Sequence, residues 1–144
     1  LAAVEMPNPH VVVRLADASA IASLDLSQPP DVVPPLPAGQ NVEFVAQTGP
    51  RRLVMRVHER GVGETMSCGT GICAAAVAMA ADAAAEQAAG PVPEEDPWLV
   101  DVPGGTCAVA LRADGSVELT GPAVLVAELT VDARWLDAPW FGAA

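Results

Sequence analysis

Residues 59–71 read ERGVGETMSCGTG, and this strand-to-helix turn decides the fold of the chain. Before it, apolar and polar residues alternate over residues 52–58, which is typical of a half-buried strand. After it, residues 69–86 carry no charge before Asp82 and are apolar on every side. Such a helix is normally buried on every face. The sequence therefore predicts a strand that turns into a buried helix.

The first turn of that helix has the chemistry of an anion site. The first backbone N–H groups of a helix lack partners within it, and the helix dipole favours negative charge there. Gly69 and Gly71 leave those groups uncovered, so that a carboxylate or phosphate can approach them. Cys68 stands at the mouth of this site, and a helix N-terminus lowers the pKa of a thiol. Cys68 is therefore a candidate thiolate beside an anion pocket.

Strand patterns dominate the rest of the chain. Further strands are predicted over residues 11–15, 41–46, 98–102, 106–111, 116–119 and 123–131. The sequence also predicts a short helix over residues 16–24, a hairpin turn over 113–116, and proline-rich loops over 29–37 and 90–97. We expect one α+β domain over residues 1–144, with a mixed, mostly antiparallel sheet curled around one central buried helix.

Composition excludes several classes of protein. The 144 residues include no lysine, so the chain can form no Schiff base with pyridoxal phosphate and has no Walker A lysine. Seven cationic residues against 18 acidic ones give a formal net charge of −11, and 3% of the residues are aromatic. No nucleic acid is expected as a partner, because the phosphate backbone repels an acidic domain and bases need aromatic side chains to stack on. No run of about 18 apolar residues and no leader pattern is present, so we expect a cytoplasmic protein without a membrane partner.

The three cysteines have plainer interpretations than catalysis. A buried cysteine is often a small apolar residue, which suits Cys73 and Cys107 and stays open for the first cysteine as well. A zinc site would need all three together with His58 or His10, but the chain has no second closely spaced pair, and we expect no metal. Residues 69–74 also match the loose G-x-G-x-x-A dinucleotide pattern, although the chain lacks the strand–helix alternation of such a domain.

Three motifs in register resemble one known family. They are Asn8-Pro9-His10, the run NVEF at residues 41–44 and the run ERGVGETMSCGTG at residues 59–71. In this order and spacing they are similar to the C-terminal half of diaminopimelate epimerase, over about residues 1–130. The resemblance implies a diaminopimelate epimerase-like fold and an isomerase that inverts one stereocentre of diaminopimelate without pyridoxal phosphate or any other cofactor.

The resemblance also implies roles for particular residues. In this family the substrate lies between two lobes that each supply one cysteine, because one base cannot serve both faces of an α-carbon. Cys68 matches the thiol of the C-terminal lobe, Glu59 the acid that accepts its proton, and His10 the histidine that partners the other thiol. Gly69 and Thr70 match backbone donors to the α-carboxylate, where negative charge develops in the reaction.

The resemblance also implies which residues bind the distal end of the substrate. Asn8, Asn41 and Arg60 match the residues that hold it, and the planar fork of arginine suits a carboxylate. Plainer alternatives stay open, because asparagines often make turn contacts, histidines are often structural, and a glutamate at a strand end often faces solvent. Pro7 departs from the family, which more commonly has glycine there; proline fixes φ and removes an N–H just before Asn8.

No second glycine-rich cysteine segment is present, so the resemblance implies that the N-terminal lobe is missing. A complete protein would interconvert LL- and meso-diaminopimelate in lysine and peptidoglycan biosynthesis, and this chain alone would be inactive. Two alternatives stay open. One is a non-catalytic module that forms a homodimer through the exposed cleft face. The other is a racemase or isomerase of the same fold for another amino acid.

Overall fold

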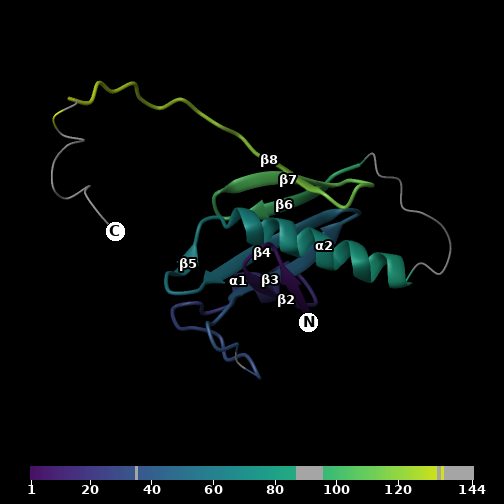
Figure 1. Cartoon of the computed structure of the whole chain (residues 1–144). Coiled ribbons are helices and arrows are strands. Elements are labelled where there is room, and N and C mark those ends of the chain that lie inside the picture. The colour runs from purple at the N-terminus through teal and green to yellow at the C-terminus, as the bar shows by residue number, and fades with distance from the viewer. Residues whose placement is uncertain (35, 87–95, 133, 135–144) are drawn as a thin grey trace.

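Eight strands and two helices make up the part of the chain that this computed structural model describes, residues 1–34, 36–86, 96–132 and 134 (Figure 1). The strands are β1 (Ala2–Glu5), β2 (Pro9–Arg14), β3 (Asn41–Gly49), β4 (Arg52–Glu59), β5 (Gly63–Thr65), β6 (Trp98–Val102), β7 (Gly105–Leu111) and β8 (Val117–Thr120). The helices are α1 (Ala18–Ala22) and α2 (Gly69–Glu86). Neither described helix combines the length and apolar character that crossing a membrane requires.

All eight strands belong to one sheet. Its order is β1-β2-β3-β4-β6-β7-β8, with β5 paired to β4. Two pairs are parallel, β2 with β3 and β4 with β6, and the others are antiparallel. Each parallel pair needs a crossover, and α1 and α2 lie in these two connections. The sheet curls into a half-barrel, so the predicted α+β class and the mixed, mostly antiparallel sheet are confirmed (Figure 1).

Helix α2 packs against strands from both halves of the sheet, β1 to β3 and β6 to β8. Its first half is buried, and Ile72 and Met79 belong to the same apolar core as Met55 of β4. Most of residues 81–85 are exposed, and Asp82 lies 3.8 Å from the Arg14 guanidinium at the surface. The expectation of a helix buried on every face is therefore wrong for residues 81–85, where the first charged residue of the helix, Asp82, is exposed.

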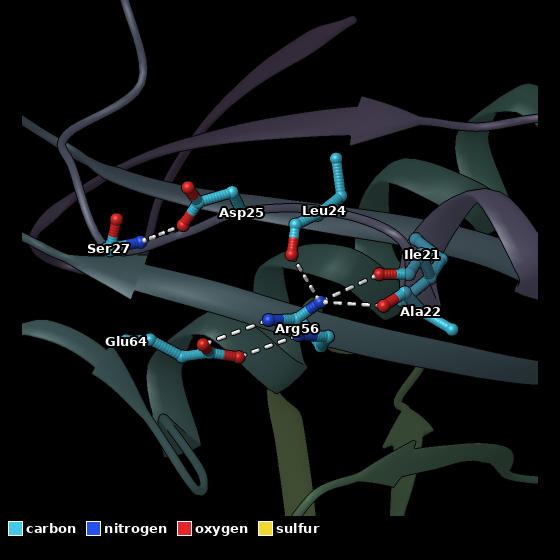
Figure 2. A network of polar contacts seen from close by, with 7 residues as sticks. All are labelled: Ile21, Ala22, Leu24, Asp25, Ser27, Arg56 and Glu64. Carbon is cyan, nitrogen blue, oxygen red and sulfur yellow. Dashed lines mark hydrogen bonds and ion pairs between the residues drawn. The ribbon is translucent and has the colours of Figure 1, made fainter.

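The opposite face of the sheet carries α1 and the segment that follows it. Helix α1 packs against β3 and β4, and Ile21 and Leu26 are buried there. Arg56 of β4 fastens this segment, since its Nη1 donates to the carbonyl oxygens of Ile21 and Leu24, both at 2.9 Å. Its Nε and Nη2 donate to the Glu64 carboxylate of β5 at 2.6 and 2.9 Å (Figure 2). One arginine thus joins three elements on this face.

Most predicted elements are confirmed, with small shifts at their ends. The helix predicted over 16–24 is shorter and begins after Asp17, whose carboxylate accepts the N–H groups of Ser19 and Ala20. The hairpin turn holds Gly115 at a φ of 84°, which favours glycine. The described residues of 29–37 form no helix or strand. The predicted loop over 90–97 lies outside the described residues, apart from its last two.

The strand predicted over residues 123–131 is wrong. After β8 the chain runs on through residues 121–132 without pairing to any described strand (Figure 1). Its large apolar side chains are exposed, among them Val124 at 79%, Leu125 at 92% and Leu129 at 84%. An apolar, β-branched pattern predicts a strand only where a sheet edge receives it. The sheet of the described residues ends at β8, and the segment leads away from it.

Candidate active site

Cys68 is the last residue before α2, directly after the turn that follows β5. Its carbonyl accepts the N–H of Ile72 at 2.8 Å, and its Sγ lies 3.6 Å from Oγ1 of Thr70. The residue is 8% exposed. The turn before Cys68 is also held by the connection between β6 and β7, because the N–H of Gly104 donates to the carbonyl of Met66 at 2.8 Å. The structure therefore places this thiol at the helix N-terminus that the sequence predicts.

Burial raises the pKa of the Cys68 thiol above its ordinary value. Hydrogen bonds with the Thr70 hydroxyl and the Gly71 backbone act in the opposite direction, whereas the negative charges of Glu59 and Glu43 reinforce burial. The predicted lowering of this pKa by the helix terminus is therefore wrong for this chain, because lost hydration outweighs the effect of the helix terminus.

Glu59 ends β4 beside the same turn. The pairing of β4 with β5 places it opposite Gly63, and its Oε1 accepts a hydrogen bond from the Thr65 hydroxyl at 2.5 Å. Its charge acts on Cys68, where it raises the pKa of the thiol. In the described part of the chain no hydrogen bond connects the two side chains. The structure thus holds a proton acceptor within electrostatic reach of the thiol.

His10 lies in a second polar group, buried between β2 and β3. Its Nδ1 lies 2.7 Å from Oε1 of Glu43, and its Nε2 lies 3.1 Å from Oδ1 of Asn8. His10 is 1% exposed and Glu43 is fully buried. Burial raises the pKa of the Glu43 carboxyl, against the opposing effect of His10. The other carboxylate oxygen, Oε2, has no hydrogen-bond partner in the described structure.

Gly71 connects the two groups. A Cβ atom at this position would lie 2.6 Å from Oε1 of Glu43, which is closer than side-chain carbons approach a neighbour. The first turn of α2 therefore rests directly against the Glu43 carboxylate. Cys68 directly precedes this turn. The first turn of α2 therefore lies next to both the thiol and the polar group of His10 and Glu43.

Asn41 and Arg60 are joined to each other. The Oδ1 of Asn41 accepts the backbone N–H of Arg60 at 2.9 Å, and Asn41 is the register partner of His10 across β2 and β3. The guanidinium of Arg60 donates through Nη1 to the carbonyl oxygens of Ala38 at 3.1 Å and Gly39 at 3.4 Å. Arg60 also lines a pocket of about 170 Å³ together with Val42, His58 and four residues of the preceding loop: Pro29, Pro30, Gly39 and Gln40. In the described structure no hydrogen bond joins its guanidinium to the Cys68 thiol.

The remaining cysteines lie elsewhere. Cys73 is buried in α2, Cys107 is half-buried in β7, and all three thiols are free. The described residues contain no group of three His, Cys, Asp or Glu side chains arranged to hold a metal ion. Pro7 is exposed, and the N–H of Met6 donates to the carbonyl of Asn8 across it at 3.0 Å. The turn before Asn8 is therefore closed without an N–H at position 7.

Glu43 is the site residue that the sequence analysis missed. Strand alternation over residues 41–46 places Val42 and Phe44 on one side, which leaves Glu43 to be taken for the solvated side. Both faces of β3 are in fact covered, by α1 on one side and α2 on the other. A carboxylate inside an otherwise apolar strand was the signal that could have identified it.

Comparison with known proteins identifies the family of the chain. The family model for diaminopimelate epimerase matches residues 2–126. The chain belongs to the diaminopimelate epimerase family. It is 51% identical to a diaminopimelate epimerase of Streptomyces coelicolor over 136 residues, which cover 93% of the chain and 46% of that relative. It is 44% identical to one of Thermobifida fusca, over 87% of the chain and 41% of the relative.

The chain spans less than half the length of these relatives. A diaminopimelate epimerase of Mycolicibacterium smegmatis gives the same proportions, with 40% identity over 94% of the chain and 44% of the relative. Among solved structures, a PhzF-family phenazine biosynthesis protein of Bacillus anthracis is similar at a TM-score of 0.47 and 15% identity, over 80% of this chain and 34% of that one. That likeness is too distant to bear on function.

Proposed function

We propose that this chain is one lobe of a two-lobed diaminopimelate epimerase, in which Cys68 exchanges a proton with one face of the substrate α-carbon. The observation that carries the proposal is the buried Cys68 thiol at the start of α2, within electrostatic reach of the Glu59 carboxylate, in a chain of this family. The missing N-terminal lobe would supply the second thiol and close the cleft. In that assembly α2 would be the central helix of this lobe.

The chemistry needs one thiolate and one thiol on opposite faces of the α-carbon. In one direction the thiolate of the other lobe removes the α-proton, and the S–H of Cys68 delivers its own proton to the opposite face, which leaves Cys68 as a thiolate. The raised pKa of Cys68 suits this donor role, since the thiol holds its proton until a carbanion accepts it. In the other direction Glu59 takes the proton of Cys68 and generates the base.

Substrate binding follows from the same elements. The backbone N–H groups of Gly69 and Thr70, at the N-terminus of α2, would bind the α-carboxylate as negative charge develops on it. Asn8, Asn41 and Arg60 would hold the distal end. Within the described structure Arg60 uses only Nη1 for the loop carbonyls, which leaves its other N–H groups for a carboxylate. Neither pyridoxal phosphate nor a metal takes part, and the reaction belongs to the cytoplasm.

A second candidate function is a non-catalytic module that self-associates. It is favoured by the exposed apolar segment at residues 121–132, which the described structure leaves uncovered. Light scattering on the 144-residue chain distinguishes the candidates. A chain that stays monomeric at high concentration contradicts self-association, and a chain that forms stable dimers without any exchange activity favours it.

The decisive experiment measures interconversion of LL- and meso-diaminopimelate in deuterated solvent, with deuterium incorporated at the inverted α-carbon. A protein that joins this chain to an N-terminal lobe should interconvert the isomers, whereas the 144-residue chain alone should not. Cys68→Ala in the joined protein should lower the rate by at least about 100-fold, because it removes the acid–base group. Cys73→Ala is the matched control, a buried cysteine five residues along the same helix, and should retain the rate. Inversion of the stereocentre by the chain alone would contradict the two-thiol mechanism.

A further inference from the structure

Glu43 is a buried carboxyl group that the two-thiol chemistry does not use. It lies in β3, is fully buried, and leaves Oε2 without a partner. A buried carboxylate with an unpaired oxygen costs free energy that a valine at this strand position would not. Its one side-chain partner in the described structure is Nδ1 of His10, at 2.7 Å. The hydrogen bond with His10 is therefore the interaction that accounts for a carboxyl group at this buried position.

We propose that Glu43 is a positioning residue, whose carboxylate holds the proton of His10 on Nδ1 so that Nε2 is the ring nitrogen that gains and loses a proton. The inference rests on the proposed function, since it assigns the orientation of the histidine that partners the second thiol. A histidine nitrogen that donates to a fixed carboxylate leaves the other nitrogen as the basic one.

Asn8 suits this arrangement at the other side of the ring. Its amide offers both an oxygen acceptor and an NH₂ donor on one rotatable group. The Oδ1 can accept from Nε2–H of the imidazolium, and after a half-turn the NH₂ can donate to the lone pair of the neutral ring. Asn8 lies 3.1 Å from Nε2. His10 can therefore change its protonation at Nε2 while it keeps a hydrogen bond in both states.

The backbone of α2 keeps the carboxylate in place. The backbone of α2 at Gly71 packs closely against Oε1 of Glu43. The carboxyl group therefore cannot move away from His10 toward the helix. The other titratable groups that act on this site electrostatically are Glu59 and Cys68. The alternative arrangement places the proton on Glu43, which would then donate to Nδ1 and leave the hydrogen on Nε2. The two arrangements differ in which ring nitrogen of neutral His10 carries hydrogen.

Long-range ¹H–¹⁵N correlation spectra of the ¹⁵N-labelled 144-residue chain distinguish them. The chain has two histidines, so His58 serves as an internal reference. We expect neutral His10 to carry its hydrogen on Nδ1, by at least about tenfold over the other tautomer. A neutral ring with its hydrogen on Nε2 would overturn the proposal, and this measurement needs no variant. In Glu43→Leu, which removes the acceptor for Nδ1–H, the preference should collapse, with the His58 signals unchanged; an unchanged His10 tautomer would equally overturn the proposal.

An activity measurement separates this proposal from the proposed function. In the joined two-lobed protein, Glu43→Leu should lower kcat at least about tenfold with KM nearly unchanged, because it removes the acceptor that keeps the His10 proton on Nδ1 and touches no substrate contact. An unchanged kcat would overturn the positioning role even if the exchange reaction itself is present. If the joined protein shows no exchange at all, the proposed function fails, while the tautomer of His10 still decides where Glu43 holds the proton.

Discussion

Replacing Arg56 with methionine tests what holds α1 and the segment after it against the sheet. The side chain is 20% exposed and donates to two carbonyl oxygens at 2.9 Å and to both oxygens of Glu64. Each partly buried carbonyl bond contributes about 1 kcal/mol, and the half-screened ion pair adds about 1 kcal/mol. Because methionine keeps the packing of the stem, Arg56→Met should lower the free energy of unfolding by about 3 kcal/mol. For a chain of this length that corresponds to about 10 °C in Tm.

Urea unfolding followed by circular dichroism measures this effect, and Arg52→Met on the same strand is the matched control. Arg52 also makes a two-pronged contact, with Asp101, but its own side chain is more exposed, at 45% against 20% for Arg56. An ion pair of that kind contributes about 0–1 kcal/mol. Equal losses in the two variants would refute the reasoning, because they would show that the carbonyl bonds at the end of α1 contribute nothing.

Two further predictions follow from the start of α2. The folded chain holds the thiol proton of Cys68 more tightly than the unfolded chain, because burial raises its pKa. The free energy of unfolding should therefore fall as pH rises above the usual thiol pKa, and Cys68→Ala should weaken this dependence; the same slope in both proteins would contradict it. Gly71→Ala should gain about 1 kcal/mol of helix propensity but lose about 1–3 kcal/mol by crowding Glu43. A net loss in urea unfolding is expected, with Ala85→Gly as the exposed control for propensity alone, and a net gain would show that Glu43 can move aside.

The sequence predicts best what depends on neighbouring residues. The range of α2 follows from an uninterrupted apolar run, and most strands follow from alternation between turn residues. Strands β1 and β5 are missed because four and three residues carry too little pattern. The false strand at 123–131 has the opposite cause, since apolar composition does not reveal whether a partner strand is present.

For the candidate site too, local sequence predicts some features and long-range packing decides the others. Motif spacing predicts that Cys68 begins a helix, but not how deeply the thiol is buried, and burial decides the direction of its pKa. The contact between His10 and Glu43 joins residues 33 positions apart, so only the parallel pairing of β2 with β3 brings them together. Long-range packing therefore supplies the electrostatics, while local pattern supplies the candidates.

The central position of β4 has a consequence for the order of folding. Strands β1 to β5 can assemble from the first half of the chain, and β6 to β8 form an antiparallel meander with short connections. Within the sheet of the described residues the two halves join where β6 pairs with β4, and the connection between these two strands contains the whole of α2. Contacts between distant segments form late, because the loop that closes them is long. The seam between β4 and β6 should therefore control how fast the chain unfolds more than how fast it folds.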